Sequence, residues 1–435
     1  MRRPRVAFLS PLPPAGTGIA DYAADVLDLL AGEVEIEAFH DQAEVDLARL
    51  PASCPAHRAA ELAARHRERP YDLAIHQLGN SLDHAFLYEH LARFPGLLVL
   101  HDLVLHHSRA RMFLDAPEAR AYAAAPSSSA RRAAAEAPIR RYAEELAYCY
   151  PEQAQRLEEA YLGTVGPLLP YTFPLFRIPV EVSRLTAVHN GFCERAVRDE
   201  VPGASTARLA MPVTRLPASE EQQRRLRERY AIAPDDFVVA SFGRLTPEKR
   251  IGTLARAVAR ASSRIGRLRL LLVGPVPGKR RLAALLAKLG VADRSVVTGR
   301  VPWSELGAHM ELADIAVHLR YPTARETSAA LLRLLAQGRP VVLSDVENFA
   351  DVPADAALRI DVTDEEGEVT RAILRLAERP ERRARLSGAA RRHAETEHSG
   401  ERCRESYMAA IERALSSPAP VPLPWPDHWL RAAHA

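Results

Sequence analysis

The sequence predicts an α/β protein made of two Rossmann-like parallel-sheet domains. Short apolar runs alternate with longer Ala- and Arg-rich stretches of helical character, and this alternation restarts after a proline-punctuated break near the middle of the chain. The apolar runs are continuous, which is typical of strands that helices cover on both faces. Because strands that alternate with helices form parallel sheets, each half is expected to hold one such sheet.

The break over 212–217 is interpreted as an interdomain linker. We therefore expect an N-terminal domain over 1–215, a second domain over 216–400 and a C-terminal helix and tail over 401–435. The expected strands are 5–10, 34–39, 73–77, 97–101, 185–189 and 207–211 in the first half, and 236–242, 268–273, 295–298, 314–319 and 340–344 in the second. Helices are expected at 18–30, 58–69, 84–93, 251–262, 329–336 and 403–415, with polar helices and a Ser-rich turn at 126–129 within 109–165.

Composition argues against several classes of protein. The net charge of +3 is too small to favour nucleic-acid binding, and only three of the 58 basic residues are lysines. The four cysteines are far apart and form no C-x-x-C pair, which disfavours a disulfide or zinc framework. The amino terminus lacks the pattern of a signal peptide, and the run Leu162–Phe176 is too short to span a membrane. We expect a cytoplasmic protein, with peripheral contact to the inner membrane face left open.

A helix between two strands in the second half is the centre of the functional prediction. Thr327 and Ser328 suit its N-terminus, and Gly338 suits a left-handed C-terminal cap. The loop before such a helix is where parallel sheets bind ligands, and the free N–H groups of its first turn favour an anion. Glu326, at this position, suits hydrogen bonds to sugar hydroxyls. The alternative is a carboxylate that only complements the helix dipole.

Cations follow the first strand of the second half. The segment Gly243–Arg250 contains Arg244 and Lys249, which suit a diphosphate because arginine forms bidentate bonds and lysine acts as a point charge. A solvated surface loop is the alternative interpretation. Further along, Val301 in the run Gly299–Trp303 offers backbone atoms and an apolar wall for a nucleotide base.

Polar residues also follow strands in the first half. Gly18 in the Gly-Thr-Gly turn lets another group approach the backbone closely, although a simple turn is an equal alternative. His101 and Asp102 come at the carboxyl end of a strand, the edge at which such sheets bind substrates. The adjacent pair His106–His107 raises the question of a metal site. Neighbouring histidines leave a helix in different directions, so no metal is expected.

Together these motifs resemble the retaining glycosyltransferases of family four, which have the GT-B fold of two Rossmann-like domains facing across a cleft. The motifs occur in order over nearly the whole chain: Gly18–Tyr22, Leu100–Asp102, Gly243–Leu245 with Lys249, Gly299–Val301, Glu326–Ser328 and Gly338–Val342. The resemblance implies that the last helix returns to the N-terminal domain.

The resemblance also implies roles for single residues. Arg244 and Lys249 would bind the donor diphosphate, Val301 would touch the base, and Gly18 would let its loop approach the phosphate. Glu326 would hold the donor sugar, with the amides of Thr327 and Ser328 beside it. His101 would lie near the sugar as a neutral donor or orienting group, and Asp102 would contact sugar or acceptor.

Two positions depart from the family pattern. A second glutamate, eight residues after the first, normally binds the ribose, but this chain has Leu334 there, as an ETS-type branch would. The family's histidine–serine pair is His189–Asn190 here. Leucine cannot accept hydrogen bonds, so either the ribose is held otherwise or donor binding is weakened.

The implied reaction moves a hexose from a nucleoside-diphosphate sugar to a glycan, glycolipid or polyprenyl-linked acceptor, as in cell-envelope polysaccharide synthesis, with retention at the anomeric carbon. It needs neither a metal nor a cofactor, because fixed cations stabilise the departing diphosphate. The main alternative is a catalytically impaired, glycosyltransferase-like partner or scaffold, suggested by Leu334. An epimerase would need more acid/base groups, and a dinucleotide dehydrogenase would need a G-x-G-x-x-G motif that the chain lacks.

Overall fold

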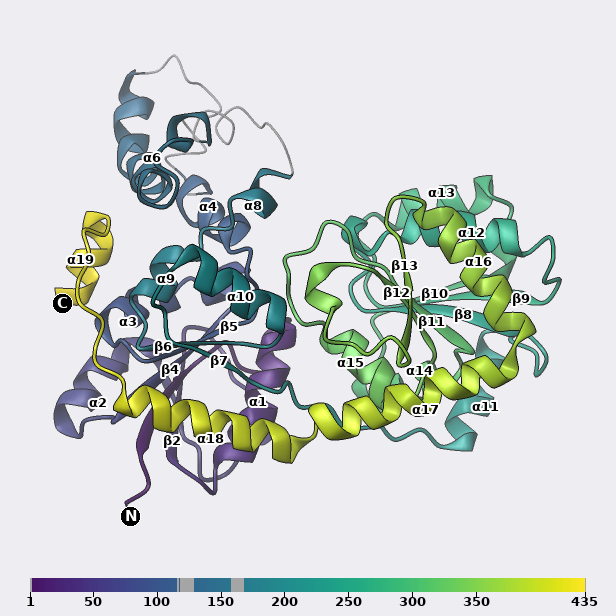
Figure 1. Cartoon of the computed structure of the whole chain (residues 1–435), viewed down its shortest axis with the longest axis horizontal. Coiled ribbons are helices and arrows are strands. Elements are labelled where there is room, and N and C mark those ends of the chain that lie inside the picture. The colour runs from purple at the N-terminus through teal and green to yellow at the C-terminus, as the bar shows by residue number, and fades with distance from the viewer. Residues whose placement is uncertain (1, 116, 118–128, 158–167, 435) are drawn as a thin grey trace. The chain divides into compact units, whose positions relative to one another are not determined.

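The computed structural model describes residues 2–115, 117, 129–157 and 168–434, and the chain divides into two compact units (Figure 1). The first unit comprises Met1–Ala210, the short segment Ala324–Thr327 and Cys403–Ala435. The second comprises Met211–Thr323 and Ser328–Arg402. The chain thus passes between the units more than once.

Within the described residues of the first unit, the strands form one parallel sheet in the order β3-β2-β1-β4-β5-β6-β7. The strands are β1 (Arg5–Leu9), β2 (Glu35–His40), β3 (Ala56–Arg58), β4 (Leu73–Leu78), β5 (Leu97–Leu100), β6 (Leu185–Val188) and β7 (Thr206–Arg208). Strands β1, β4, β5 and β6 are buried along their full length, which explains their continuous apolar character.

The helices of the first unit lie between its strands and at its C-terminal end. They are α1 (Gly18–Leu30), α2 (Leu62–Glu68), α3 (Leu87–Arg93), α4 (His106–Leu114), α6 (Ser129–Cys149), α8 (Leu169–Thr172), α9 (Arg177–Glu181), α10 (Gly191–Glu200) and α19 (Asp427–His434). Thr17 caps α1 by accepting from the Ala20 amide, and Asn190 caps α10 by accepting from Cys193. Helix α18 (Gly400–Ser416) begins in the second unit and continues in the first.

In the second unit, the parallel strand order is β10-β9-β8-β11-β12-β13 among the residues described. The strands are β8 (Phe237–Phe242), β9 (Leu268–Val273), β10 (Ser295–Gly299), β11 (Ile315–His318), β12 (Val341–Ser344) and β13 (Ala357–Ile360). The helices are α11 (Glu220–Arg229), α12 (Ile251–Ala261), α13 (Lys279–Lys288), α14 (Trp303–Glu311), α15 (Ala329–Ala336), α16 (Glu365–Glu378) and α17 (Pro380–Glu397). Helices α12 and α16 share one apolar core with this sheet.

Both sheets confirm the predicted α/β class, with some differences in detail. The sequence interpretation missed β3 and β13 and placed β7 at 207–211 rather than Thr206–Arg208. Residues 58–61, predicted as helix, end β3 and form a short 3-10 turn before α2. Of the Ser-rich turn predicted at 126–129, only Ser129 is among the described residues, and it begins α6.

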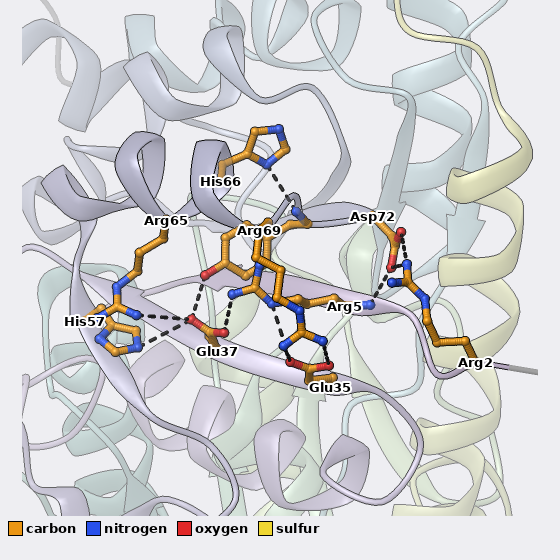
Figure 2. Close-up of polar contacts among 10 residues, drawn as sticks. Arg2, Arg5, Glu35, Glu37, His57, Arg65, His66, Arg69 and Asp72 are labelled. Atoms are coloured by element: carbon orange, nitrogen blue, oxygen red, sulfur yellow. Dashed lines mark hydrogen bonds and ion pairs between the residues drawn. The ribbon is translucent and has the colours of Figure 1, made fainter.

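A cluster of ion pairs lies at the amino-terminal edge of the first sheet (Figure 2). The buried Glu37 carboxylate pairs with Arg5 at 2.5 Å and accepts a hydrogen bond from the Tyr71 hydroxyl at 2.6 Å. Glu35 beside it pairs with Arg69. The cluster joins four arginines to three carboxylates and lies opposite the edge at which parallel sheets bind ligands, so its role is to hold β1 and β2 to the chain before β4.

None of the helices in the described part of the chain has the length and apolar character that spanning a membrane requires.

Candidate functional site

The strand order of the second unit locates its ligand-binding edge. Strands β8 and β11 are neighbours, and the order reverses between them. In sheets of this kind, ligands bind outside the carboxyl ends of the strands at this reversal. The loop after β8 contains Arg244 and Lys249, and the loop after β11 leads to α15.

Three glycines, together called the glycine floor below, lie along this edge. Gly243, Gly274 and Gly299 come at the ends of three neighbouring strands, β8, β9 and β10, and have φ angles of +101°, +134° and +71°. A Cβ at Gly274 would lie 2.0 Å from the Gly243 carbonyl oxygen, so no other residue fits there. The backbone therefore carries no side chains at the point where a phosphate would approach.

Lys249 lies directly over this floor. Its side chain is buried, and its ammonium donates to the Phe242 carbonyl oxygen at 3.3 Å and lies 3.5 Å from His318 Nδ1. A Cβ built on Gly243 would lie 3.6 Å from Lys249 Nζ and 3.8 Å from Ala330 Cβ. Lys249, Gly243 and the first turn of α15 thus converge within the second unit.

The other two cations of the loop after β8 differ from Lys249 and from each other. Arg244 is exposed, and its guanidinium has no ion-pair or hydrogen-bond partner among the described residues. Arg250 donates through Nε to the buried Glu365 at 2.8 Å and has a left-handed φ of +53°. Arg244 and Lys249 are therefore the cations of this loop that suit an anion, whereas Arg250 holds the start of α12 to α16.

The N-terminus of α15 completes this set. Ser328 is its N-cap and accepts a hydrogen bond from the Leu331 amide, and the helix spans Ala329–Ala336 as predicted. Gly338 after it has the predicted positive φ, at +67°. The amides of the first turn supply partial positive charge beside Lys249.

Val301 is half-buried in the loop between β10 and α14. Trp303, two residues on, is 48% exposed, and the Arg333 guanidinium lies over its ring at 4.7 Å. Leu334, where the family pattern has its second glutamate, is fully buried within α15. Its side chain contributes packing and no hydrogen-bond acceptor.

In the first unit, His101 is part of a buried polar chain. Its Nε2 lies 2.8 Å from Gln77 Oε1, and its Nδ1 lies 3.2 Å from His189 Nε2. Burial and the neighbouring His189 and His84 hold the pKa of His101 well below its ordinary value, so the ring is neutral. Both ring nitrogens contact protein groups, which fits an orienting role better than a direct contact to substrate.

Two tyrosines support this chain. The Tyr22 ring of α1 packs edge-on against His101, with ring centroids 4.8 Å apart, and its hydroxyl lies 2.7 Å from that of Tyr407. Gln77 donates to the Tyr407 hydroxyl at 3.1 Å. Helix α18, which carries Tyr407, therefore fixes residues at the carboxyl edge of the first sheet.

Two further predicted residues of the first unit, Asp102 and Gly18, come after strands at the same edge of the sheet. Asp102 is half-buried and accepts a hydrogen bond from the Asn80 amide at 2.8 Å. Gly18 begins α1, and a Cβ there would meet nothing within 4 Å, so a steric need for glycine does not arise from the protein itself.

Glu326 and Thr327 lie in the short segment Ala324–Thr327, which belongs to the first unit. The Ala324 carbonyl oxygen accepts from the amides of Leu103 and Val104, next to Asp102. The Asn190 side chain donates to the Arg325 carbonyl oxygen at 3.3 Å and to Thr327 Oγ1 at 3.1 Å. These contacts fix the backbone on both sides of Glu326.

Sequence reasoning missed three contributors to these arrangements: Gln77, Gly274 and His318. Gln77 and His318 each come at or near the end of an apolar strand, and a polar residue there was a usable signal. Gly274 follows β9 directly, as Gly243 follows β8. The residue Asn190 was noted only as a departure from a pattern, yet it caps α10 and holds the segment with Glu326.

Residues 222–393 match the family model described as glycosyl transferases group 1. The second unit belongs to this family. The matched segment includes the glycine floor, Arg244, Lys249 and α15. The residues that converge there are therefore those of a glycosyl transferase group 1 domain.

Curated relatives match over shorter segments. A GDP-mannose-dependent alpha-(1-6)-phosphatidylinositol monomannoside mannosyltransferase of Mycolicibacterium smegmatis is 34% identical over 114 residues, 26% of this chain and 28% of that protein. A D-inositol 3-phosphate glycosyltransferase of Stackebrandtia nassauensis is 31% identical over 204 residues, 43% of this chain and 45% of its own length. The chain thus aligns with less than half of either relative.

Solved structures show the fold of the whole chain. A sucrose-phosphate synthase from Thermosynechococcus elongatus matches with a TM-score of 0.67 at 17% identity, over 95% of this chain and 99% of that one. Anabaena HepE, in complex with UDP and glucose, matches with a TM-score of 0.64 at 15% identity, over 94% of this chain and 100% of that one. The group 1 domain and the first unit therefore have the two parallel-sheet folds of these proteins.

Proposed function

We propose that the chain is a retaining glycosyltransferase that moves a hexose from a nucleoside-diphosphate sugar to a glycan or lipid-linked acceptor. The observation that supports this most is the convergence of Lys249, the glycine floor and the N-terminus of α15 in the group 1 domain. Glycines without side chains, a buried ammonium and the amides of a helix N-terminus together suit an anion such as a diphosphate.

The chemistry of this site suits departure of the diphosphate. Negative charge grows on the leaving oxygen as the bond to the anomeric carbon breaks, and groups fixed in advance stabilise it without reorganising. Lys249 is held by protein acceptors, while the exposed Arg244 is free among the described residues to bind the outer phosphate. In this proposal these cations do the work that a metal ion does in other transferases.

The sugar would be held from the segment that carries Glu326. Its carboxylate suits hydrogen bonds to sugar hydroxyls, and the amides of Thr327 and Ser328 follow it. Asp102, at the carboxyl edge of the first sheet, suits the orientation of sugar or acceptor. The neutral His101 beside it suits an indirect role, through its contacts with Gln77 and His189. The proposed retention of configuration follows the family resemblance.

Names of related proteins guide the choice of donors for a first screen. The mycobacterial relative is described as GDP-mannose-dependent, and HepE was solved with UDP and glucose. GDP-mannose and UDP-glucose are therefore the first donors to test. Inositol phosphates and phosphatidylinositol mannosides are the first acceptors, because the curated relatives act on such molecules by name.

A second function is favoured by one observation. The fully buried Leu334 supplies no acceptor for the ribose, which suits a catalytically impaired partner or scaffold. Such a protein would show neither transfer nor stabilisation by any nucleotide sugar.

The deciding experiment measures donor hydrolysis and transfer by the wild type and by Lys249→Met, with the exposed Lys288→Met as the matched control. We expect Lys249→Met to lower kcat by about 100-fold or more, the loss seen when one preorganised charge donor is removed. Lys288→Met should match the wild type, and NMR of the product should show the donor's anomeric configuration. Inversion would contradict retention, and a wild type that neither binds nor turns over any donor would favour the scaffold.

A further inference from the structure

His318 is a buried imidazole at the last position of β11. Its side chain is fully buried, and its ring lies 5.7 Å from that of Phe349. The rest of the strand, Ile315 to Val317, is apolar and equally buried. An aliphatic side chain would fill this position and would bury no polar atom that needs a hydrogen-bond partner.

The contact with Lys249 defines the state of the ring. An ammonium group has donors only, so His318 Nδ1, 3.5 Å from Lys249 Nζ, must present its lone pair. The proton then lies on Nε2, which has no hydrogen-bond partner in the described part of the structure. Burial, together with the charges of Lys249 and Arg320, holds the pKa of His318 well below its ordinary value, so the ring stays neutral.

A buried donor without a partner lowers stability, and burial of a polar ring there gives the fold nothing that leucine would not. The gain lies with Lys249. A lysine side chain has four rotatable bonds, and its ammonium is well placed only if acceptors fix it. Phe242 of β8 and His318 of β11 supply such acceptors from the two neighbouring strands between which the sheet order reverses.

We propose that His318 is a positioning residue that orients the Lys249 ammonium over Gly243 to receive the diphosphate of the nucleotide. The inference rests on the proposed function, because it assigns Lys249 to the donor diphosphate. It predicts that replacing His318 by leucine weakens ligand binding by more than it lowers the stability of the folded state.

The first test uses calorimetry to measure the binding of UDP, GDP and inorganic pyrophosphate. It compares the wild type with His318→Leu, His318→Asn, Lys249→Met and the double variant that carries both His318→Leu and Lys249→Met. His318→Leu should weaken binding by about tenfold, as expected for one hydrogen bond to a charged group. His318→Asn places a carbonyl oxygen near the position of Nδ1 and should restore most of the affinity. In the Lys249→Met background, His318→Leu should have no further effect.

Equal binding by His318→Leu and the wild type would overturn the proposal. So would an effect of His318→Leu that persists unchanged in the Lys249→Met background, because that would show a structural role independent of the lysine. Thermal unfolding of each variant accompanies the binding data. A loss of stability in His318→Leu that matches its loss of binding would also overturn the proposal.

A second measurement needs no ligand. The chain has only three lysines, so selective ¹⁵N-lysine labelling gives few ammonium signals, which Lys279→Arg and Lys288→Arg assign. The Lys249 signal should be protected from exchange in the wild type and in His318→Asn, and should be lost in His318→Leu. An unchanged Lys249 signal in His318→Leu overturns the inference. A wild type that shows the protected signal but binds no diphosphate refutes the glycosyl-transfer proposal instead.

Discussion

Gly243 shows how a single residue sets the chemistry of the site. Its φ of +101° is open to glycine and strained for other residues, and its missing side chain leaves the space between Lys249 and Ala330 empty. In the proposed site the glycine would thus have a conformational role and a binding role at once. A matched pair of substitutions can separate them.

Gly243→Ala should lower the free energy of unfolding by about 1–3 kcal/mol, because alanine is strained at this φ. It should also weaken binding of UDP or GDP, since the added methyl group would lie 3.6 Å from Lys249 Nζ. Gly278→Ala is the control: it has a φ of +76° and open space around it. Denaturant unfolding and calorimetry should show lost stability in both variants and lost binding only in Gly243→Ala; equal binding losses would contradict the assignment.

Glu145 is a buried carboxylate that holds the C-terminal helix α19 to the first unit. It pairs with Arg109 through two nitrogens and accepts hydrogen bonds from Trp429 Nε1 at 2.7 Å. His428 Nε2 lies 2.8 Å from it. Burial by itself would raise the pKa of Glu145, but the charge and hydrogen bonds of Arg109, with those of His428, lower it to about 2.

This lowered pKa predicts a loss of stability in acid. The folded-state value lies below the ordinary 4.5, so the stabilisation is complete above about pH 4.5 and is lost as the pH falls toward 2. Its size is on the order of 3 kcal/mol. Tryptophan emission in a Trp303→Phe background reports Trp425 and Trp429 alone and should show the transition.

Glu145→Gln should remove this pH dependence and destabilise the first unit at neutral pH by about 3–5 kcal/mol, because Arg109 is left buried without its partner. Glu144→Gln, at a half-buried neighbour, is the control and should retain the transition. An acid profile unchanged by Glu145→Gln would contradict the role of this carboxylate.

At the scale of elements, the proposed function assigns anion binding to the N-terminus of α15. Its length, its capping serine and the glycine that ends it were all predicted from local residue preferences, and the structure agrees. The strands β3 and β13 escaped prediction for the opposite reason. Each is short and only partly buried, so each lacks the apolar run by which a strand is recognised.

Ser328→Ala should cost about 0.5–2 kcal/mol of stability, the usual loss for an N-cap, and should weaken binding of a diphosphate because the first turn of α15 frays. Ser219→Ala removes the N-cap and capping box of α11 in the same unit and is the matched control. Unfolding and calorimetry should show similar losses of stability and a loss of binding in Ser328→Ala only. Equal binding by the two variants would contradict the anion role of α15.

At the scale of the whole molecule, the two sheets have the same strand order. In each, the first three strands of the unit lie in reverse order on one side, and the later strands follow in order on the other. Ligand binding in the second unit should therefore protect the carboxyl edge of one sheet and leave its amino edge unaffected. The cluster around Glu37, at the amino edge of the first sheet, should be equally unaffected.

Hydrogen exchange with and without UDP or GDP tests this expectation. At a nucleotide concentration about 100 times Kd, local opening that abolishes binding becomes costlier by about 2.7 kcal/mol. Slower exchange is expected in 243–250, 299–303 and 328–332. Protection confined to 233–237, at the amino edge of the second sheet, would contradict the site.

The sequence by itself determined the two parallel-sheet halves, the helix α15 with both its caps, and the type of charge after β8, because each depends on residues near one another in the chain. Only the tertiary structure decided which of these residues act together. It paired Arg250 with Glu365, left Arg244 exposed, and placed His318 beside Lys249. Such pairings join residues 69 to 115 positions apart. The order of the strands in the sheet and the packing of α12 against α16 bring them into contact, and no pattern of neighbouring residues specifies either.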